Sequence, residues 1–294
     1  MKLIRNILLF LTLLGVSEAY GQELVHKVSK EISDNFDQEI QEVHVRGEKA
    51  SVTVSGWSKD YIQVNLKPIS RNTSKKEAIS DLKFIRYEAY MEGKNLLIKN
   101  SFKGKNEKIS SNLSMEIEIL MPGAIPIQIS NLYGPVKATE LSNIKLDVSF
   151  GHIAIAHISG YASITARYSN MTISRALGAL HIQAEKSDIN ADGIDAMTSI
   201  TSKYGKADLK LSASDQSLRM DAYRTEVKIE VDAFEEFNYS LSTTYGTIST
   251  PGFSSEKKEK LQISHDENNK DIEVSTTYSD ITIASKLLPY AKTE

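Results

Sequence analysis

One recurring aromatic position in the second half of the chain is the strongest candidate for surface chemistry. Each instance is an aromatic residue, then Gly or Ser, any residue, and apolar residues at spacing two, as in Phe150-Gly151-His152-Ile153. The aromatic members are Tyr133, Phe150, Tyr168, Tyr204, Tyr245 and Tyr278. Exposed aromatic rows suit the faces of sugars, so these six residues are predicted as a surface binding strip. The alternative is structural, because stacked rings stabilise one another by about 0.5–1.5 kcal/mol per pair.

Two repeats carry a cation where the others carry a ring, namely Lys186 and Arg224. A long amphipathic side chain can lie along a neighbouring ring and keep its charge in water. The two cations therefore indicate that the position is not deeply buried. They also interrupt a continuous aromatic platform, which favours the structural interpretation of the row.

Residues that carry metal or nucleophilic chemistry show no comparable pattern. The chain has no cysteine, which excludes disulfides, thiolate metal sites and cysteine nucleophiles. The six histidines lack metal or catalytic spacing, and each is predicted to be a solvated surface residue. Replacing His265 by Ala is accordingly expected to change almost nothing. No cofactor and no metal are predicted.

A mild acidic cluster is the remaining candidate for catalysis. Asp188, Asp192 and Asp195 lie close together in sequence, with Asp208 and Asp215 further on. In a β-helix such residues would converge as a calcium site or as an acid pair. The preferred interpretation is a row of solvated loop residues, which predicts that the protein is not an enzyme.

Composition limits the class of partner. The chain has 294 residues, of which 40% are hydrophobic, so a folded core is expected. Lys and Arg total 35 against 38 for Asp and Glu, which leaves no basic excess to neutralise phosphates. Nucleic acid is therefore not predicted as a partner.

The spacing of the recurring position predicts the fold. When the two cations are included, the numbers of successive positions differ by 17, 18, 18, 18, 20, 21 and 33. A fixed period of roughly 18 residues, with strands and no helices, is typical of a β-solenoid. We predict an all-β, single-stranded β-helix-like stack over residues 126–290, with coils of ~18 residues and about three short strands each. The last interval holds a charged insertion, about residues 251–270, predicted as a loop and hairpin.

The repeat also predicts which side chains point inward. Leu146 and Val148 in one repeat, and Ile164 and Ala166 in the next, alternate at period two before the aromatic residue. The alternation changes phase at the Gly/Ser position, which requires a bend or bulge. The glycines at this position (Gly134, Gly151, Gly205 and Gly246) are predicted to supply the freedom in φ that the bend needs.

The amino-terminal part, residues 22–125, is predicted to be strand-rich. Val43 and Val45, then Val52 and Val54, alternate on either side of a polar turn, which is typical of an antiparallel β-meander. The segment Ser74-Lys75-Lys76-Glu77 has the pattern of a capping box and predicts one short helix ending at about Leu82.

Residues 1–21 have the pattern of an export signal. Lys2 and Arg5 precede an apolar run, Ile7 to Val16, and small residues then allow cleavage after Ala19 or, as we favour, after Gly21. The run is half of the ~20 residues that a membrane span needs, and no transmembrane span is predicted in the mature chain. Without a cysteine for lipid attachment, we expect an exported protein in the periplasm or on the outer surface of a Gram-negative bacterium.

The motifs resemble a large bacterial family of putative adhesins built from β-strand repeats, a domain of unknown function. The resemblance is carried by Met121-Pro122-Gly123 after an alternating strand, by Tyr133-Gly134-Pro135-Val136 and its repeats, and by the opening Val52-Thr53-Val54-Ser55-Gly56-Trp57. It covers about Phe36 to Ala284 and implies an exported β-solenoid with no catalytic residues to carry over. Lys186, Arg224 and the insertion after Pro251 depart from the family pattern.

These observations favour a non-enzymatic protein of the cell envelope, an adhesin-like binding or interaction module. The expected partner is an envelope protein or a glycan. One alternative is a polysaccharide-active enzyme, because β-helices host such enzymes, although this rests on fold analogy. The other alternative is a scaffold partner in an envelope-stress system.

Overall fold

The computed structural model describes residues 25–103, 108–211, 217–255, 260–265 and 270–287. The predicted leader, residues 1–21, lies outside these ranges. The chain divides into two compact units, the first ending at Lys137 and the second beginning at Ala138. The prediction of an all-β protein is confirmed, since α1 (Lys75–Asp81) and two single 3-10 turns are the helical elements of the described residues. No helix in these ranges is long and apolar enough to cross a membrane.

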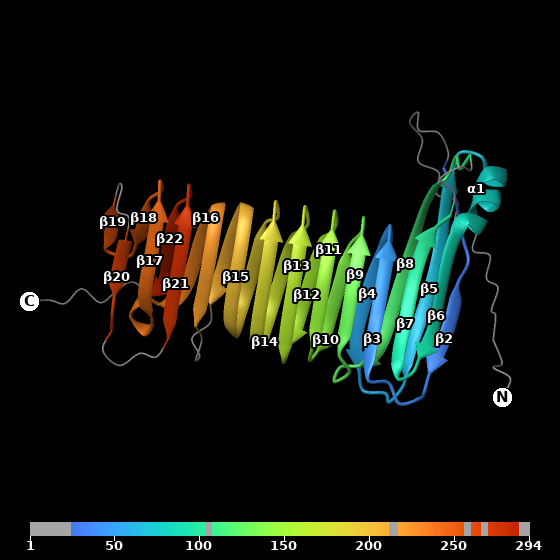
Figure 1. Ribbon diagram of the computed structural model, residues 1–294, viewed down its shortest axis with the longest axis horizontal. Helices are drawn as coiled ribbons and strands as arrows, with labels where there is room; N and C mark the ends of the chain where they lie inside the picture. The colour runs from blue at the N-terminus through green and yellow to red at the C-terminus, as the bar shows by residue number, and fades with distance from the viewer. Residues whose placement is uncertain (1–24, 104–107, 212–216, 256–259, 266–269, 288–294) are drawn as a thin grey trace, which may run out of the picture. The chain divides into compact units, whose positions relative to one another are not determined.

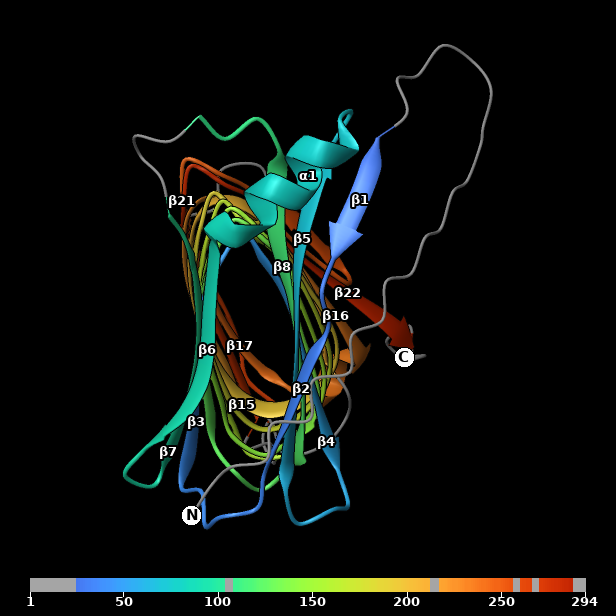
Figure 2. The same ribbon diagram turned by 90° about the vertical axis from the view of Figure 1, so that its right-hand side faces the viewer.

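In its described residues, the first unit contains nine complete strands and the helix. The strands are β1 (His26–Ser29), β2 (Ile32–Phe36), β3 (Glu42–Glu48), β4 (Ala50–Trp57), β5 (Ile62–Asn72), β6 (Ile85–Glu92), β7 (Asn95–Phe102), β8 (Asn112–Pro122) and β9 (Ile127–Leu132). They form two layers, which Figure 2 shows facing each other, with β5 and β8 in one layer and β6 and β7 in the other. The alternating valines of β3 and β4 are buried between the layers.

The predicted antiparallel meander is wrong for β3 and β4, which have parallel partners. β3 lies between β7 and β9 and is parallel to both, and β4 is parallel to β8. The turn that separates β3 from β4 therefore leads from one layer to the other, with Lys49 at φ 46°. Other strands follow the expected pattern, since β5 is antiparallel to β1, β2 and β8, and β6 is antiparallel to β7. Period-two alternation shows which face of a strand is buried but does not distinguish a parallel from an antiparallel partner.

The predicted helix is confirmed at the predicted cap. The Ser74 side chain accepts a hydrogen bond of 3.3 Å from the Glu77 backbone N–H, which satisfies one free donor of the first turn. The helix ends at Asp81, and a 3-10 turn (Leu82–Phe84) follows. The buried Asp81 carboxylate accepts from the backbone N–H groups of Ser110 and Ser111 at 3.2 and 3.0 Å, which ties the helix to the segment before β8.

The second unit is a stack of paired strands. Its strands are β11 (Ile144–Ser149), β12 (His152–Ile158), β13 (Tyr161–Arg167), β14 (Asn170–Glu185), β15 (Ile189–Leu211), β16 (Leu218–Ala233), β17 (Asn238–Thr244), β18 (Ile248–Thr250), β19 (Phe253–Ser255), β20 (Lys260–Ile263), β21 (Asp271–Thr277) and β22 (Ile281–Leu287). The strand β10 (Val136–Leu141) crosses the division between the units. Figure 1 shows the repeats from β11 to β16 following one another along the stack.

Successive repeats pair in parallel with an offset of one repeat. Ile144 of β11 lies opposite Ala162 of β13, and His152 of β12 lies opposite Asn170 of β14, so the numbers of the partners differ by 18 in both cases. One repeat therefore contains two strands joined by two corners, whereas three strands were expected. The strands are longer than expected, with six residues in β11 and seven in β12, and they leave room for only two corners.

The inward frame is confirmed. Ile164 is fully buried and lies between Leu146 and Ile182 of the neighbouring repeats, which are equally inaccessible to solvent. Every repeat thus adds a layer of apolar side chains to one continuous core. Burial of this kind contributes about 25 cal/mol per Å² of apolar surface and is the main source of stability in such stacks.

The last two repeats are in reversed order in space. β16 pairs with β21 and β22, and these two strands pair in turn with β17 and β18. The later repeat therefore lies between β16 and the earlier repeat. The described parts of the insertion form β19, antiparallel to β18, and β20, antiparallel to β17. These short strands occupy the edge that β17 and β18 would otherwise leave unpaired.

Candidate binding surface

A left-handed backbone conformation places the recurring aromatic position at one corner of each repeat. All its members have φ between 48° and 63°: Tyr133, Phe150, Tyr168, Lys186, Tyr204, Arg224, Tyr245 and Tyr278. This conformation turns the chain from one strand into the next and explains the change of phase in the apolar pattern. The predicted role of the neighbouring glycines is wrong, because none of the four has a positive φ in the described residues.

These glycines are needed for close approach between repeats. A Cβ on Gly205 would lie 2.3 Å from the carbonyl oxygen of Ser187, and one on Gly246 would lie 2.1 Å from that of Ser279. Both distances are far below van der Waals contact. Glycine here allows two backbones to approach, which is its second common use in sheets.

The backbone requires a positive φ at this corner but does not require a ring. The opposite corner uses the same conformation, with φ of 58°, 56° and 54° at Glu140, His157 and Arg175, and its next member is Gly193. The left-handed region costs most residues about 1–2 kcal/mol, and glycine avoids that cost. The aromatic side chains at one corner are therefore selected for what they contact, not for the turn they make.

The rings and cations of the second unit stack on their equivalents in neighbouring layers, and the order follows the sequence from Phe150 to Arg224. Phe150 and Tyr168 are parallel within 11°, with ring centroids 4.9 Å apart. The Lys186 ammonium lies 4.8 Å from the centre of the Tyr168 ring and donates a hydrogen bond of 2.8 Å to its hydroxyl. This bond raises the pKa of Lys186 above its usual value. At the other end, Tyr245 and Tyr278 stack at 5.0 Å.

Arg224 occupies an aromatic cage. The centre of its guanidinium lies 5.9 Å from the Tyr204 ring, 5.5 Å from the Tyr223 ring and 5.4 Å from the Tyr278 ring. Tyr223 also packs edge-on against both of the other rings. Tyr223 is not among the six predicted residues, because it stands one position before the repeat frame. Tyr223 directly precedes Arg224, a cation that replaces a ring of the repeat, and this was the sequence signal that could have identified it.

We call this set the ring row, and its members in spatial order are Phe150, Tyr168, Lys186, Tyr204, Arg224, Tyr278 and Tyr245. The aromatic members up to Tyr278 are 42–49% exposed, and Tyr245 reaches 76% at the outermost repeat. Because neighbouring rings and cations cover the ring faces, the row presents ring edges and phenolic hydroxyls to solvent. The sixth predicted residue, Tyr133, belongs to the first unit, where it is 50% exposed.

A line of buried hydroxyls lies directly behind the ring row. Ser187 accepts a hydrogen bond of 2.9 Å from the Ser169 backbone N–H and donates one of 2.9 Å to the Glu185 carbonyl. Ser169 repeats the arrangement one layer away, where it accepts from Gly151 N–H at 3.0 Å. These bonds fix the corners from which the rings project.

We expect Ser187→Ala to destabilise the second unit by about 1–3 kcal/mol, because the buried Ser169 N–H loses its acceptor. Urea unfolding followed by circular dichroism measures the effect. The matched control is Ser199→Ala, which removes an exposed hydroxyl from β15. Equal midpoints for the two variants would show that the buried hydroxyl has no structural role.

The acidic candidates hold structural contacts. The Asp188 carboxylate accepts a hydrogen bond of 3.0 Å from the Lys206 backbone N–H, and Asp192 forms an ion pair of 3.3 Å with Lys210. Asp215 lies outside the described residues. Across the described part of the chain, no three His, Asp or Glu side chains converge in a way that could hold a metal ion.

His265 differs from the prediction of a solvated histidine. Its ring is half-buried, and its Nδ1–H donates a 2.7 Å hydrogen bond to the Phe237 carbonyl. Its backbone N–H donates to the Asn238 side chain at 2.9 Å. Sequence spacing gives no indication of these contacts, because Phe237 and Asn238 are 28 and 27 residues away. The expectation that His265→Ala would change almost nothing is therefore withdrawn.

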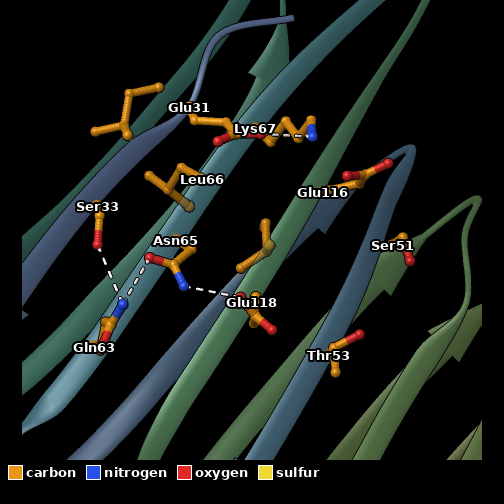
Figure 3. A pocket seen from close by; sticks show the side chains of 12 residues that line it. Glu31, Ser33, Ser51, Thr53, Gln63, Asn65, Leu66, Lys67, Glu116 and Glu118 are labelled. Atoms are coloured by element: carbon orange, nitrogen blue, oxygen red, sulfur yellow. Dashed lines mark hydrogen bonds and ion pairs between the residues drawn. The ribbon is translucent and has the colours of Figure 1, made fainter. Parts of the chain in front are cut away.

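A hollow of about 630 Å³ in the first unit is lined by residues of β2, β4, β5 and β8 (Figure 3). Its polar side chains bind one another. Lys67 pairs with Glu31 at 2.7 Å, and Asn65 donates to Glu118 at 2.8 Å. Figure 3 shows these contacts along the strand surface. A surface whose charged groups are already paired is a weaker candidate than the ring row.

Comparison with known proteins gives one family match and several structural ones. A family model described as Toastrack DUF4097 matches residues 40–284. No curated protein matches the chain. A putative adhesin from Bacteroides fragilis is 9% identical, with 86% of this chain and 97% of that chain covered and a TM-score of 0.45. A putative adhesin from Parabacteroides merdae is 8% identical, with 87% of this chain and 95% of that chain covered and a TM-score of 0.42. A putative lipid binding protein from Parabacteroides distasonis is 10% identical, with 87% of this chain and 96% of that chain covered and a TM-score of 0.41.

Proposed function

We propose, from the premise that the chain belongs to the Toastrack DUF4097 family, that it is an exported, non-enzymatic binding module of the bacterial envelope with the ring row as its contact surface. The resemblance to a family of β-strand repeat proteins is thereby confirmed. The module is a β-solenoid over residues 126–290, and the leader in residues 1–21 supports export to the periplasm or the cell surface.

The observation that carries the proposal is the choice of side chains at one corner. Both corners need the same left-handed backbone, yet in the described residues only one of them carries rings and ring-bound cations. A half-exposed Tyr combines apolar area with a polar tip and loses little conformational freedom on binding, which is why Tyr and Arg are enriched in binding hot spots. The core behind the row fixes the spacing of these groups, so the contact surface is preorganised.

We expect Tyr204→Ser to weaken binding of the purified protein to isolated bacterial envelopes by about tenfold, which corresponds to about 1.4 kcal/mol. Tyr161→Ser is the matched control, because this tyrosine is 48% exposed against 42% for Tyr204 and lies outside the row. Sedimentation of labelled protein with the envelopes measures the affinity. Equal losses in both variants, or no binding by the parent protein, would overturn the proposal.

A further inference from the structure

The Arg224 cage has a chemistry that the rest of the ring row lacks. Among the described residues, the Arg224 guanidinium contacts only the three surrounding rings and has neither a hydrogen bond nor an ion pair. A shallow hollow of about 590 Å³ opens beside it, lined also by Gly205, Glu226 and Tyr278. Arg224 itself is one of the residues that line this hollow.

Within the described residues, neither acidic group that lines the hollow forms an ion pair with Arg224. Glu226 forms an ion pair of 3.3 Å with Lys206. Asp280 accepts a hydrogen bond of 2.7 Å from the Thr247 backbone N–H. Both carboxylates thus have partners of their own, whereas the donors of the guanidinium remain available. An arginine fork held in place by packing is suited to a planar carboxylate, which it binds through two parallel hydrogen bonds.

The exposed parts of the neighbouring rings also favour an anion. Aromatic rings are electropositive at their edges, and the row presents edges because its faces are covered. Lys186 provides a second cation two layers before Arg224, with Tyr204 between them. Adjacent strands lie about 4.8 Å apart, so the two cations are separated by roughly 10 Å along the stack. The phenolic hydroxyl of Tyr204, between them, can bond to a sugar hydroxyl.

We propose that the ring row binds an acidic polysaccharide and that Arg224 binds a uronic acid carboxylate of that polymer. The inference rests on the proposed function, since it names the ligand class of the same surface. A polymer is favoured over a single small anion because hydrogen-bonding edges and cations repeat in register along the stack. A protein with acidic side chains is the competing ligand, and the experiment below distinguishes it.

The test uses oligomers of a uronic acid polysaccharide, for example oligogalacturonate, and the same oligomers after chemical reduction of their carboxylates. Titration calorimetry with the full protein measures both affinities. We expect the acidic oligomer to bind about tenfold or more tightly than the reduced one, with the difference shrinking as salt is added. Equal affinities for the two oligomers would overturn the proposal.

Variants assign the effect to the cage. Arg224→Gln is expected to lower the affinity for the acidic oligomer about tenfold or more, and Arg224→Lys is expected to restore only part of it, because an ammonium lacks the fork. Arg219→Gln removes an exposed arginine of β16 outside the row and is expected to change nothing. Thermal unfolding of each variant verifies that it is folded. An unchanged affinity in Arg224→Gln would contradict the inference.

The outcomes separate this inference from the proposed function. If envelopes bind and the binding depends on Tyr204 but neither oligomer binds, the acidic polysaccharide is wrong and the binding module stands. If protease treatment of the envelopes abolishes that binding, the ligand is a protein and the inference is wrong. If neither envelopes nor oligomers bind, both proposals fail.

Discussion

Ile164→Asp is expected to unfold the second unit or to make it aggregate. Ile164 is fully buried between Leu146 and Ile182, so an introduced carboxylate would have no water and no partner. Burying an unpaired charge costs several kcal/mol, which is a large part of the stability of a typical domain. Thermal and urea unfolding followed by far-ultraviolet circular dichroism measure the loss.

The pH dependence of this variant identifies the cause. Burial raises the pKa of the introduced carboxyl above its unfolded value of about 3.9. The folded state then binds more protons than the unfolded state, so stability falls as the pH rises above that value. The variant should therefore lose less stability at about pH 4 than at about pH 7, relative to the parent protein.

The matched control is Leu177→Asp, which places the same carboxylate on a side chain that is 49% exposed. It should unfold close to the parent protein. An Ile164→Asp variant that melts like the parent would mean that the inward frame of the repeats is wrong, and the ring row would lose its structural basis.

Gly134→Ala should destabilise the first unit by about 3 kcal/mol. Its Cβ would lie 2.1 Å from the Ala50 carbonyl oxygen and 2.8 Å from the carbonyl carbon, so the backbones must separate. The buried Asn131 side chain resists the separation, because its amide donates to both the Ala50 and Gly134 carbonyls at 2.8 and 2.9 Å.

Tryptophan fluorescence during urea unfolding measures this loss, since the single tryptophan, Trp57, ends β4 in the first unit. Gly93→Ala is the control. It introduces the same methyl group where nothing lies within 4 Å, although its φ of 62° adds a strain of about 1 kcal/mol. If Gly134→Ala loses no more than Gly93→Ala, close approach is not the reason for a glycine at this corner.

The repeat and its inward frame could be predicted because every layer must bury equivalent apolar side chains. Leu146, Ile164 and Ile182 must all be buried at the same point of the turn, so the sequence repeats them at a fixed interval. The corner position of the ring row was equally visible, because its residues recur at the same interval, but Lys186 and Arg224 favoured a structural interpretation of the row from sequence alone. Tyr223 was not predicted as part of the cage, because it stands outside the repeat frame. Its contact with the Tyr278 ring depends on the order in which the layers stack.

Strand pairing was less predictable for a physical reason. Val43 and Val45 need one buried face, and that need is met equally by parallel and antiparallel partners. The order of the last two repeats was hidden in the same way. Tyr245 and Tyr278 begin equivalent motifs, so the sequence does not show which of them contacts Arg224. The structure shows that Tyr278 does.

The reversed order of the last two repeats has a consequence for biosynthesis. A ribosome releases β17 and β18 before β21 and β22, yet the earlier pair finds its parallel neighbours only in the later one. Until β21 and β22 emerge, β16 has an unpaired edge, and β17 and β18 lack the parallel strands with which they pair. A nascent chain interrupted before residue 270 would therefore expose unpaired backbone, which chaperones and proteases recognise. Completion of the stack therefore depends on the synthesis of β21 and β22.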